Sequence, residues 1–297
     1  MQIKKSAVVF GLAILFLVPF ASAGFFDFMT GKLSAQDEQV NISVGNTAPQ
    51  IIYVEGTNAN PTEESSKDVT FSVNVYDHDL KEDINTSSVT ATFSKGGTTR
   101  STTCNTPATV NANTLSFSCT ITMWYWDAAA SDWTVSVSAK DLSGVEATNN
   151  TQTFTYNSLT AFKMSPTLLT WSEILPSATN QKSNNDPTVL NNTGNYVVSA
   201  GNIKINATDL AGEIVDTKII YGSNFTVSKT LDSECSGDAL SSSAYVGVTG
   251  ADLGTGNLSA GGVAQQNVYY CIPKVPPTVT KQAYSTTKNG AWTVKIV

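Results

Sequence analysis

The chain has 297 residues, with 24 acidic against 17 basic side chains and a formal net charge of −7. Only 14% of the residues are charged, and Lys and Arg do not cluster. Nucleic acids and anionic membrane surfaces are bound through clustered basic residues. This composition therefore argues against nucleic acid as a partner and predicts a polar, weakly charged surface.

The first 23 residues have the pattern of a signal peptide. Lys4 and Lys5 precede an apolar run over residues 7–20, and Ala21-Ser22-Ala23 has the small-x-small form of a signal peptidase site. The run is shorter than the roughly 20 residues that a spanning helix needs, and no second apolar run follows. We expect cleavage before Gly24 and a secreted or cell-surface product without a transmembrane segment, with an uncleaved anchor as the alternative.

Residues 24–45 are interpreted as an N-terminal tether with a candidate strand at 40–44. Beyond it, apolar and polar residues alternate with the two-residue period of strands that bury one face. Short strands at this spacing predict an all-β fold and an immunoglobulin-like β-sandwich over residues 46–157. The predicted strands are 51–55, 69–76, 89–93, 98–104, 115–123, 133–140 and 147–156.

The alternation also identifies the residues that should face the core. They form three rows, of four, five and four residues, dominated by Val, Ile and aromatic side chains. The rows are Val69, Phe71, Val73 and Val75; Leu115, Phe117, Cys119, Ile121 and Met123; and Trp133, Val135, Val137 and Ala139.

The pattern is looser after residue 157, where a polar stretch at 177–186 interrupts it. Further strands are predicted at 203–208, 217–227, 267–272 and 291–297. They indicate a second β-sandwich domain over residues 158–297, which makes the whole chain a tandem pair behind a signal peptide. The last strand closes its own sheet or pairs with the edge of a neighbouring chain.

The four cysteines fall into two local pairs, Cys104 with Cys119 and Cys235 with Cys271. An exported chain meets an oxidising compartment, so we expect two disulfides, although three pairings are formally available. A four-thiolate metal site is the alternative. It is disfavoured because no Cys-x-x-Cys spacing occurs.

Several segments resemble known proteins. Asn46-Thr47-Ala48-Pro49 precedes a first strand, Val73-Asn74-Val75-Tyr76-Asp77 ends a second, and Trp133-Thr134-Val135-Ser136-Val137-Ser138-Ala139-Lys140-Asp141 forms a sixth. Together these segments resemble exported bacterial and archaeal immunoglobulin-like surface domains, over about residues 46–157. The stretch from Gly24 to Lys32 is similar to the leading segment of secreted archaeal proteins, and residues 191–195 are similar to a turn of envelope β domains. The resemblance implies scaffolding or adhesion without catalytic residues.

Carboxylates gather at two predicted loops. Asp77, Asp79 and Asp83 follow the second strand, and Asp141 follows the sixth. In an immunoglobulin-like topology the two loops lie at the same end, where clustered carboxylate oxygens can hold Ca²⁺. The segment is not an EF-hand, because its sixth position is Glu82 and its twelfth is Ser88. Solvated turn residues are the alternative, and no other cofactor is indicated.

Trp124 and Trp126 extend the strand at 115–123. Continued alternation turns both indoles outward, where flat aromatic faces suit the stacking of sugar rings or protein contacts. A bend near Asp127 would instead fold them over the core or against the second domain. The pair is therefore a candidate polysaccharide-binding site.

Catalysis is not expected. His78 is the only histidine and lies between Asp77 and Asp79, too close in sequence for a triad. A secreted hydrolase would need a pocket with convergent carboxylates, which no pattern marks.

Seven Asn-x-Ser/Thr sequons occur, at Asn41, Asn85, Asn149, Asn191, Asn206, Asn224 and Asn257. The abundance of Asn, Ser and Thr accounts for this number by chance, so glycosylation stays conditional on the host. The sequence as a whole predicts a secreted structural or adhesive glycoprotein that binds other envelope proteins or itself. A carbohydrate-binding module is the second interpretation and a secreted hydrolase the third.

Overall fold

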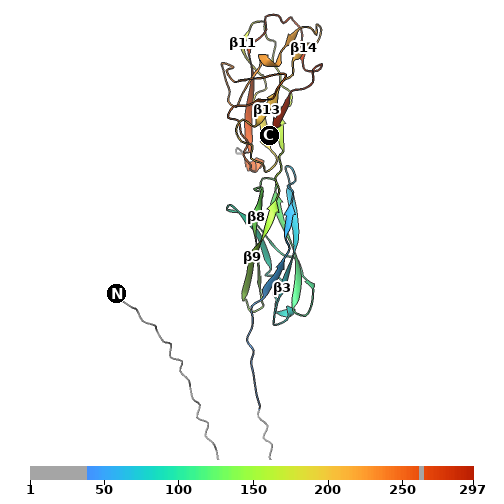
Figure 1. Ribbon diagram of the computed structural model, residues 1–297, viewed down its shortest axis with the longest axis vertical. Coiled ribbons are helices and arrows are strands. Elements are labelled where there is room, and N and C mark those ends of the chain that lie inside the picture. The colour runs from blue at the N-terminus through green and yellow to red at the C-terminus, as the bar shows by residue number, and fades with distance from the viewer. Residues whose placement is uncertain (1–38, 261–263) are drawn as a thin grey trace, which may run out of the picture. The chain divides into compact units, whose positions relative to one another are not determined.

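The computed structural model describes residues 39–260 and 264–297 (Figure 1). The chain divides into two compact units, residues 1–45 and residues 46–297. The predicted signal peptide and most of the predicted tether lie outside the described residues. The candidate strand at 40–44 is wrong: its apolar side chains Val40, Ile42 and Val44 are exposed, and it pairs with no strand of the described residues.

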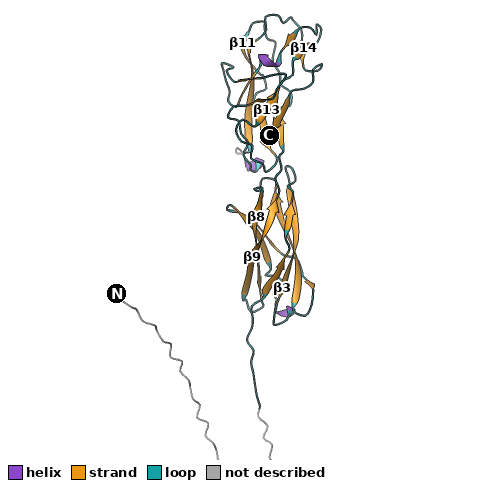
Figure 2. Ribbon diagram, viewed as in Figure 1, coloured by secondary structure: helices purple, strands orange, loops and turns teal. Residues whose placement is uncertain are grey.

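The described residues are all-β, with strands joined by loops and only three short 3₁₀ helices (Figure 2). In the first half the elements are β1 (Gln50–Val54), β2 (Thr57–Ala59), β3 (Ser66–Tyr76), η2 (Lys81–Asp83), β4 (Thr90–Lys95), β5 (Thr98–Thr103), β6 (Ala108–Thr109), β7 (Thr114–Trp124), β8 (Ala130–Lys140) and β9 (Glu146–Tyr156). All seven predicted strands are present. The sequence did not predict β2 and β6, which are too short to show a period.

Two sheets enclose the first core. One has the order β1-β3-β7-β6 and the other the order β2-β9-β8-β4-β5. The pair β3 and β7 is antiparallel from Ser66 opposite Trp124 to Tyr76 opposite Thr114, without a shift of register. Among the strands of residues 39–260 and 264–297, only β2 and β9 pair in parallel. The β-branched residues of these long strands favour extended chain because their side chains pack on a pleated surface.

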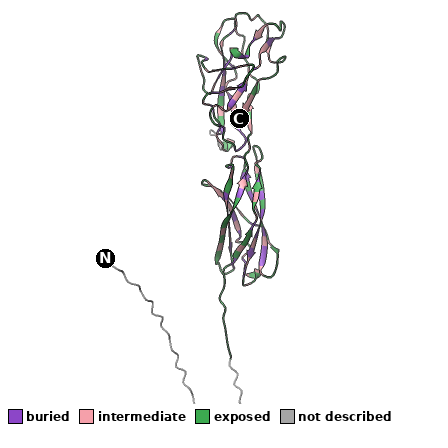
Figure 3. Cartoon of the chain, viewed as in Figure 1, coloured by how far each residue is buried: buried purple, intermediate pink, exposed green. Residues whose placement is uncertain are grey.

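All three predicted inward rows are buried in this core (Figure 3). The ring of Phe93 stacks between Phe71 and Phe154, at centroid distances of 5.3 and 4.4 Å. The predicted disulfide between Cys104 and Cys119 is present and joins the end of β5 to β7. It therefore ties one sheet to the other at the side of the sandwich.

The second half has shorter elements. They are β10 (Phe162–Ser165), β11 (Thr179–Lys182), β12 (Thr188–Asn192), β13 (Ile203–Asn206), β14 (Leu210–Gly212), β15 (Ile219–Ile220), η3 (Gly222–Asn224), β16 (Thr226–Ser228), β17 (Asp238–Ala239), β18 (Val246–Gly247), η4 (Leu258–Ala260), β19 (Gln265–Lys274), β20 (Tyr284–Ser285) and β21 (Thr293–Ile296). Three sheets result: β10-β12-β19-β16-β17 with β11 beside β19, then β18-β13-β21, then β15-β14-β20.

A second cluster of buried apolar side chains fills this half, and it includes Leu190, Ile203, Ile205, Phe225 and Val268. The predicted disulfide between Cys235 and Cys271 is present. The continuous strand predicted at 217–227 is wrong. The chain is interrupted there by η3, and its first residue, Gly222, packs so close to Ala207 that a Cβ would lie 2.1 Å from the Ala207 carbonyl oxygen.

Candidate functional site

The acidic residues stand where two rows of the first core end. Alternation along β3 places Asp77 next in the inward row after Val75, and alternation along β8 places Asp141 next after Ala139. Both aspartates have no exposed surface. Ile84 forms an isolated antiparallel β-bridge with Asp141, and the Leu142 amide donates a hydrogen bond to the Asp83 carbonyl at 2.8 Å. The segments that follow β3 and β8 are therefore in contact. The loops therefore lie at one end of the core, as the sequence predicted.

Three of the four predicted carboxylates converge. One side-chain oxygen each of Asp77, Asp79 and Asp83 lies within 4.8 Å of the others. We call these three residues the aspartate cluster. Asp141 lies beside it, and its Oδ2 accepts a 2.8 Å hydrogen bond from Asn46 Nδ2. Burial opposes ionisation of Asp141, but hydrogen bonds from Asn46 and from backbone amides prevail and lower its pKa.

The environment of Asp77 differs from that of its neighbours. Its Oδ1 accepts the Asp79 amide at 2.8 Å, whereas its Oδ2 and the buried Oδ2 of Asp83 have no hydrogen-bond partner among the described residues. Burial raises the pKa of Asp77; the Asp79 amide opposes this, and repulsion by the nearby carboxylates adds to it. Asp77 is thus a buried carboxyl with one oxygen unsatisfied.

The Asn46–Thr47 segment contacts the same carboxylates. The amide and the hydroxyl of Thr47 donate to Asp79 Oδ2 at 2.7 and 2.8 Å, and they lower the pKa of Asp79. The sequence places Asn46 and Thr47 before the first strand of the resemblance and assigns them no hydrogen bond. Their contacts span 95 and 32 residues, and no local pattern signals hydrogen bonds of such range.

The predicted aromatic pair is formed as a stack. The rings of Trp124 and Trp126 lie 4.8 Å apart with an interplanar angle of 13°, and Trp124 is 37% exposed. Tyr125, the residue between them, has a buried side chain, and its hydroxyl accepts a hydrogen bond from the Leu258 amide. The indoles cover one face of each other, and the half-buried Trp126 also packs against the Tyr125 ring at 4.7 Å, so Trp124 is the more accessible ring.

The second half contains a cavity of about 720 Å³ that the sequence did not predict. Its lining is mostly apolar, and Phe225 packs edge-on against Trp171 and Trp292 at 5.2 and 4.9 Å. Both indole N–H groups donate to backbone carbonyls, of Gln181 and Thr208. Two segments that are mostly loop, at 164–176 and 279–286, form much of the wall, and loops of mixed composition carry no periodic signal.

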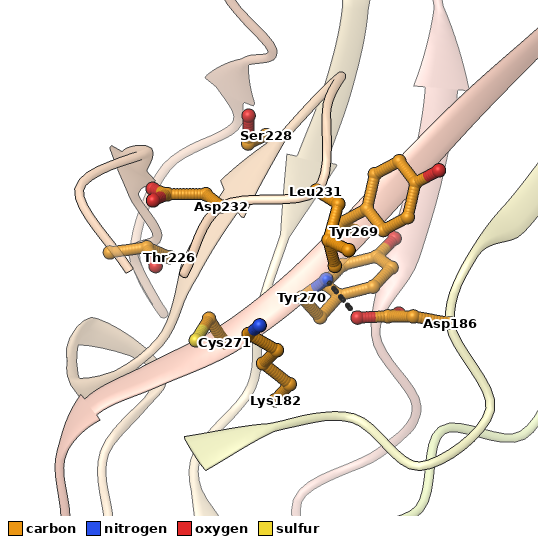
Figure 4. A pocket seen from close by; sticks show the side chains of 9 residues that line it. All are labelled: Lys182, Asp186, Thr226, Ser228, Leu231, Asp232, Tyr269, Tyr270 and Cys271. Atoms are coloured by element: carbon orange, nitrogen blue, oxygen red, sulfur yellow. Dashed lines mark hydrogen bonds between the residues drawn. The ribbon is translucent and has the colours of Figure 1, made fainter. Parts of the chain in front are cut away.

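A separate pocket of about 10 Å³ lies beside Asp186 (Figure 4). It has room for about one water molecule. The Asp186 Oδ2 accepts the Tyr270 amide at 3.0 Å, and its Oδ1 is buried without a partner among the described residues. Burial raises the pKa of Asp186 to about 6, although the hydrogen bond opposes the shift.

The stability of the second half should depend on the protonation of Asp186. A carboxyl whose pKa is raised on folding stabilises the fold when protonated, and this contribution is lost as the pH rises through 6. We expect the melting temperature of the wild type to rise, relative to Asp186→Asn, as the pH falls from 7 to 4.5. Asp232→Asn is the control, because Asp232 lines the same pocket but its pKa is lowered. Parallel wild-type and Asp186→Asn profiles would contradict the assignment.

The sequon asparagines do not share one environment. Asn41 and Asn257 are exposed, and the other five are half-buried. Three of these five are held by hydrogen bonds beyond their own sequon: Asn149 to the Ile51 carbonyl, Asn191 to Gln265, and Asn224 to the Tyr221 amide. Asn41 and Asn257 are therefore the most accessible acceptors.

No protein-family model matches the chain, and a search of curated proteins finds no relative. Within residues 39–260 and 264–297, none of the helices has the length and apolar character to cross a membrane. Function is therefore inferred from the fold and its side chains alone.

Proposed function

We propose that this chain is an exported structural or adhesive protein of the cell surface, built from two tandem β-sandwich domains. The strand order around the first core is the observation that supports this most. In immunoglobulin-like domains strands A, B, E and D form one sheet, and C, F and G the other. Lettered along the chain, β1-β3-β7-β6 corresponds to A-B-E-D and β9-β8-β4 to G-F-C, with β5 beside C. This order supports an immunoglobulin-like first domain.

The outer faces and edges support a role in contacts. Hydroxyl pairs such as Thr70 with Thr120, at 2.9 Å, and Thr90 with Ser138, at 3.1 Å, cover the sheets with short polar side chains. The strands β5 and β21 stand at sheet edges, where one row of main-chain groups is open to a further strand. Other envelope proteins and further copies of this chain are the proposed partners.

The two disulfides support export. Disulfides form and persist in oxidising compartments and are rare in reducing ones. Each bridge closes a loop, of 15 and 36 residues, and each half of the chain holds one. A secreted or extracellular location is therefore part of the proposal.

Size-exclusion chromatography with light scattering tests the proposed function on the protein without residues 1–23, together with co-sedimentation with the envelope of the source cell. A structural or adhesive protein should form ordered oligomers or co-sediment with envelope. The proposal would be contradicted if the protein stays monomeric at high concentration and remains in the supernatant when the envelope is sedimented.

Carbohydrate binding is the second candidate function, favoured by the exposed ring of Trp124 stacked on Trp126. Aromatic faces stack on the apolar faces of sugars. In that case the protein should be monomeric and retained on polysaccharide, and Trp124→Ala with Trp126→Ala should abolish the retention. Tyr221→Ala, which removes an exposed aromatic ring elsewhere, should leave it unchanged.

A further inference from the structure

We propose that Asp77, Asp79 and Asp83 form a Ca²⁺ site at the end of the first core, and that the ion stabilises the loop between β3 and β4. The aspartate cluster contains a fully buried carboxyl, Asp77, whose Oδ2 has no partner among the described residues. The Oδ2 of Asp83 is also buried and unpartnered in the same part of the chain. A buried oxygen without a donor is costly. A bound cation would satisfy both oxygens.

The charge of the cluster supports a cation rather than a neutral ligand. In the described residues, no salt bridge reaches Asp77, Asp79, Asp83 or the neighbouring Asp141. The nearest lysine in sequence, Lys81, pairs with Glu82 instead. Like charges at such distances oppose one another's ionisation. A divalent cation would offset this repulsion. The side-chain amide of Asn46 relieves it only at Asp141, and the amide and hydroxyl of Thr47 relieve it only at Asp79.

The chemistry of the donors selects the metal. The converging atoms are all carboxylate oxygens, which Ca²⁺ and Mg²⁺ prefer, whereas zinc and copper prefer nitrogen and sulfur. The single imidazole nearby, His78, is exposed and its Nδ1 contacts Tyr76 Oη at 3.2 Å. Ca²⁺ accepts irregular sets of six to eight oxygens, whereas Mg²⁺ requires a near-ideal octahedron. An irregular loop that presents three carboxylates therefore suits Ca²⁺ better.

The site would also order the start of the sandwich. Asp79 Oδ2 already accepts two hydrogen bonds from Thr47, so an ion that fixes Asp79 also fixes the residues that lead into β1. The site needs only the first core and its loops, so it is independent of the proposed function. Binding of Ca²⁺ to the purified protein can be measured whatever the protein's cellular location and partners are, so the two proposals can fail separately.

Calorimetric titration and thermal unfolding test the site on purified protein stripped of metal with EGTA. We expect one Ca²⁺ per chain, with a dissociation constant in the range of about 10⁻⁵ to 10⁻³ M. At 10 mM CaCl₂ the first core should melt about 3–10 °C higher. MgCl₂ at the same concentration should have a smaller effect, and NaCl at matched ionic strength almost none. An equal response to all three salts would overturn the proposal.

Variants with one charge removed locate the site. Asp83→Asn should abolish the response to Ca²⁺ and leave the metal-free protein as stable as the wild type or more so, because it removes a repulsion. Glu82→Gln is the matched control: it lies in the same loop and removes the same charge, but its carboxylate pairs with Lys81 outside the aspartate cluster. Retained binding in Asp83→Asn, or loss of binding in Glu82→Gln, would overturn the assignment.

Discussion

Trp133→Ala should lower the free energy of unfolding of the first core by about 3–5 kcal/mol. Trp133 has no exposed surface and is one of the largest side chains in this core. Truncation removes its apolar contacts and leaves a cavity between the sheets. It also removes the hydrogen bond that the indole N–H donates to the Ala128 carbonyl at 2.9 Å, so a polar group near the β7–β8 turn loses its partner.

Urea unfolding followed by far-ultraviolet circular dichroism, without reductant, measures this effect. Trp124→Ala is the matched control, because it removes the same side chain from a site that is 37% exposed. We expect it to cost about 1 kcal/mol, mostly the stacking with Trp126. Similar losses in the two variants would show that Trp133 does not pack as described.

Long strands made the first half predictable. In β3, β7 and β8, each of 11 residues, alternation persists for several periods, and a one-residue slip would turn every Val and Phe outward. The site itself was predicted from strand order, because the loops after the second and sixth predicted strands lie at the same end of an immunoglobulin-like sandwich. In the structure, Asp77 and Asp141 also continue two inward rows past the strand ends. A charged residue at the next inward position of an apolar row is a signal that a sequence alone can supply.

Short strands made the second half less predictable. Strands such as β14, β15 and β20 have two or three residues, fewer than any period requires. Gly222, within the break at residues 217–227, packs closely against Ala207, and much of the wall of the large cavity is formed by loops. Such features depend on contacts between distant segments, which propensity does not encode.

The ion pair between Arg100 and Asp127 was not predicted, although the sequence contains a signal for it. Arg100 is the only arginine of the chain and lies in a strand of Thr and Ser. Asp127 was considered only as the site of a bend. In the structure the guanidinium of Arg100 donates to both carboxylate oxygens of Asp127, which is 2% exposed. The rarity of arginine here marks a position where its two-pronged geometry is used.

Asp127→Asn should cost about 3 kcal/mol of stability. Asp127 Oδ2 accepts the Arg100 Nε at 3.0 Å and the Trp124 amide at 2.8 Å, so the carboxylate fixes both β5 and the turn after β7. Removing one partner of a buried pair leaves the other charge uncompensated, which costs about 3–5 kcal/mol. The Arg100 side chain is 25% exposed, so the lower end of that range is expected.

Asp132→Asn provides the comparison, because it removes an identical charge from the Lys95–Asp132 pair, where the Asp132 side chain is 65% exposed. Solvent screens such a pair, and its loss should cost about 1 kcal/mol or less. A double-mutant cycle with Arg100→Met and Asp127→Asn, measured by urea unfolding, should give a coupling energy of about 1.5 kcal/mol or more. If the two single losses simply add, the carboxylate stabilises the turn through the Trp124 amide alone, and the ion pair contributes nothing.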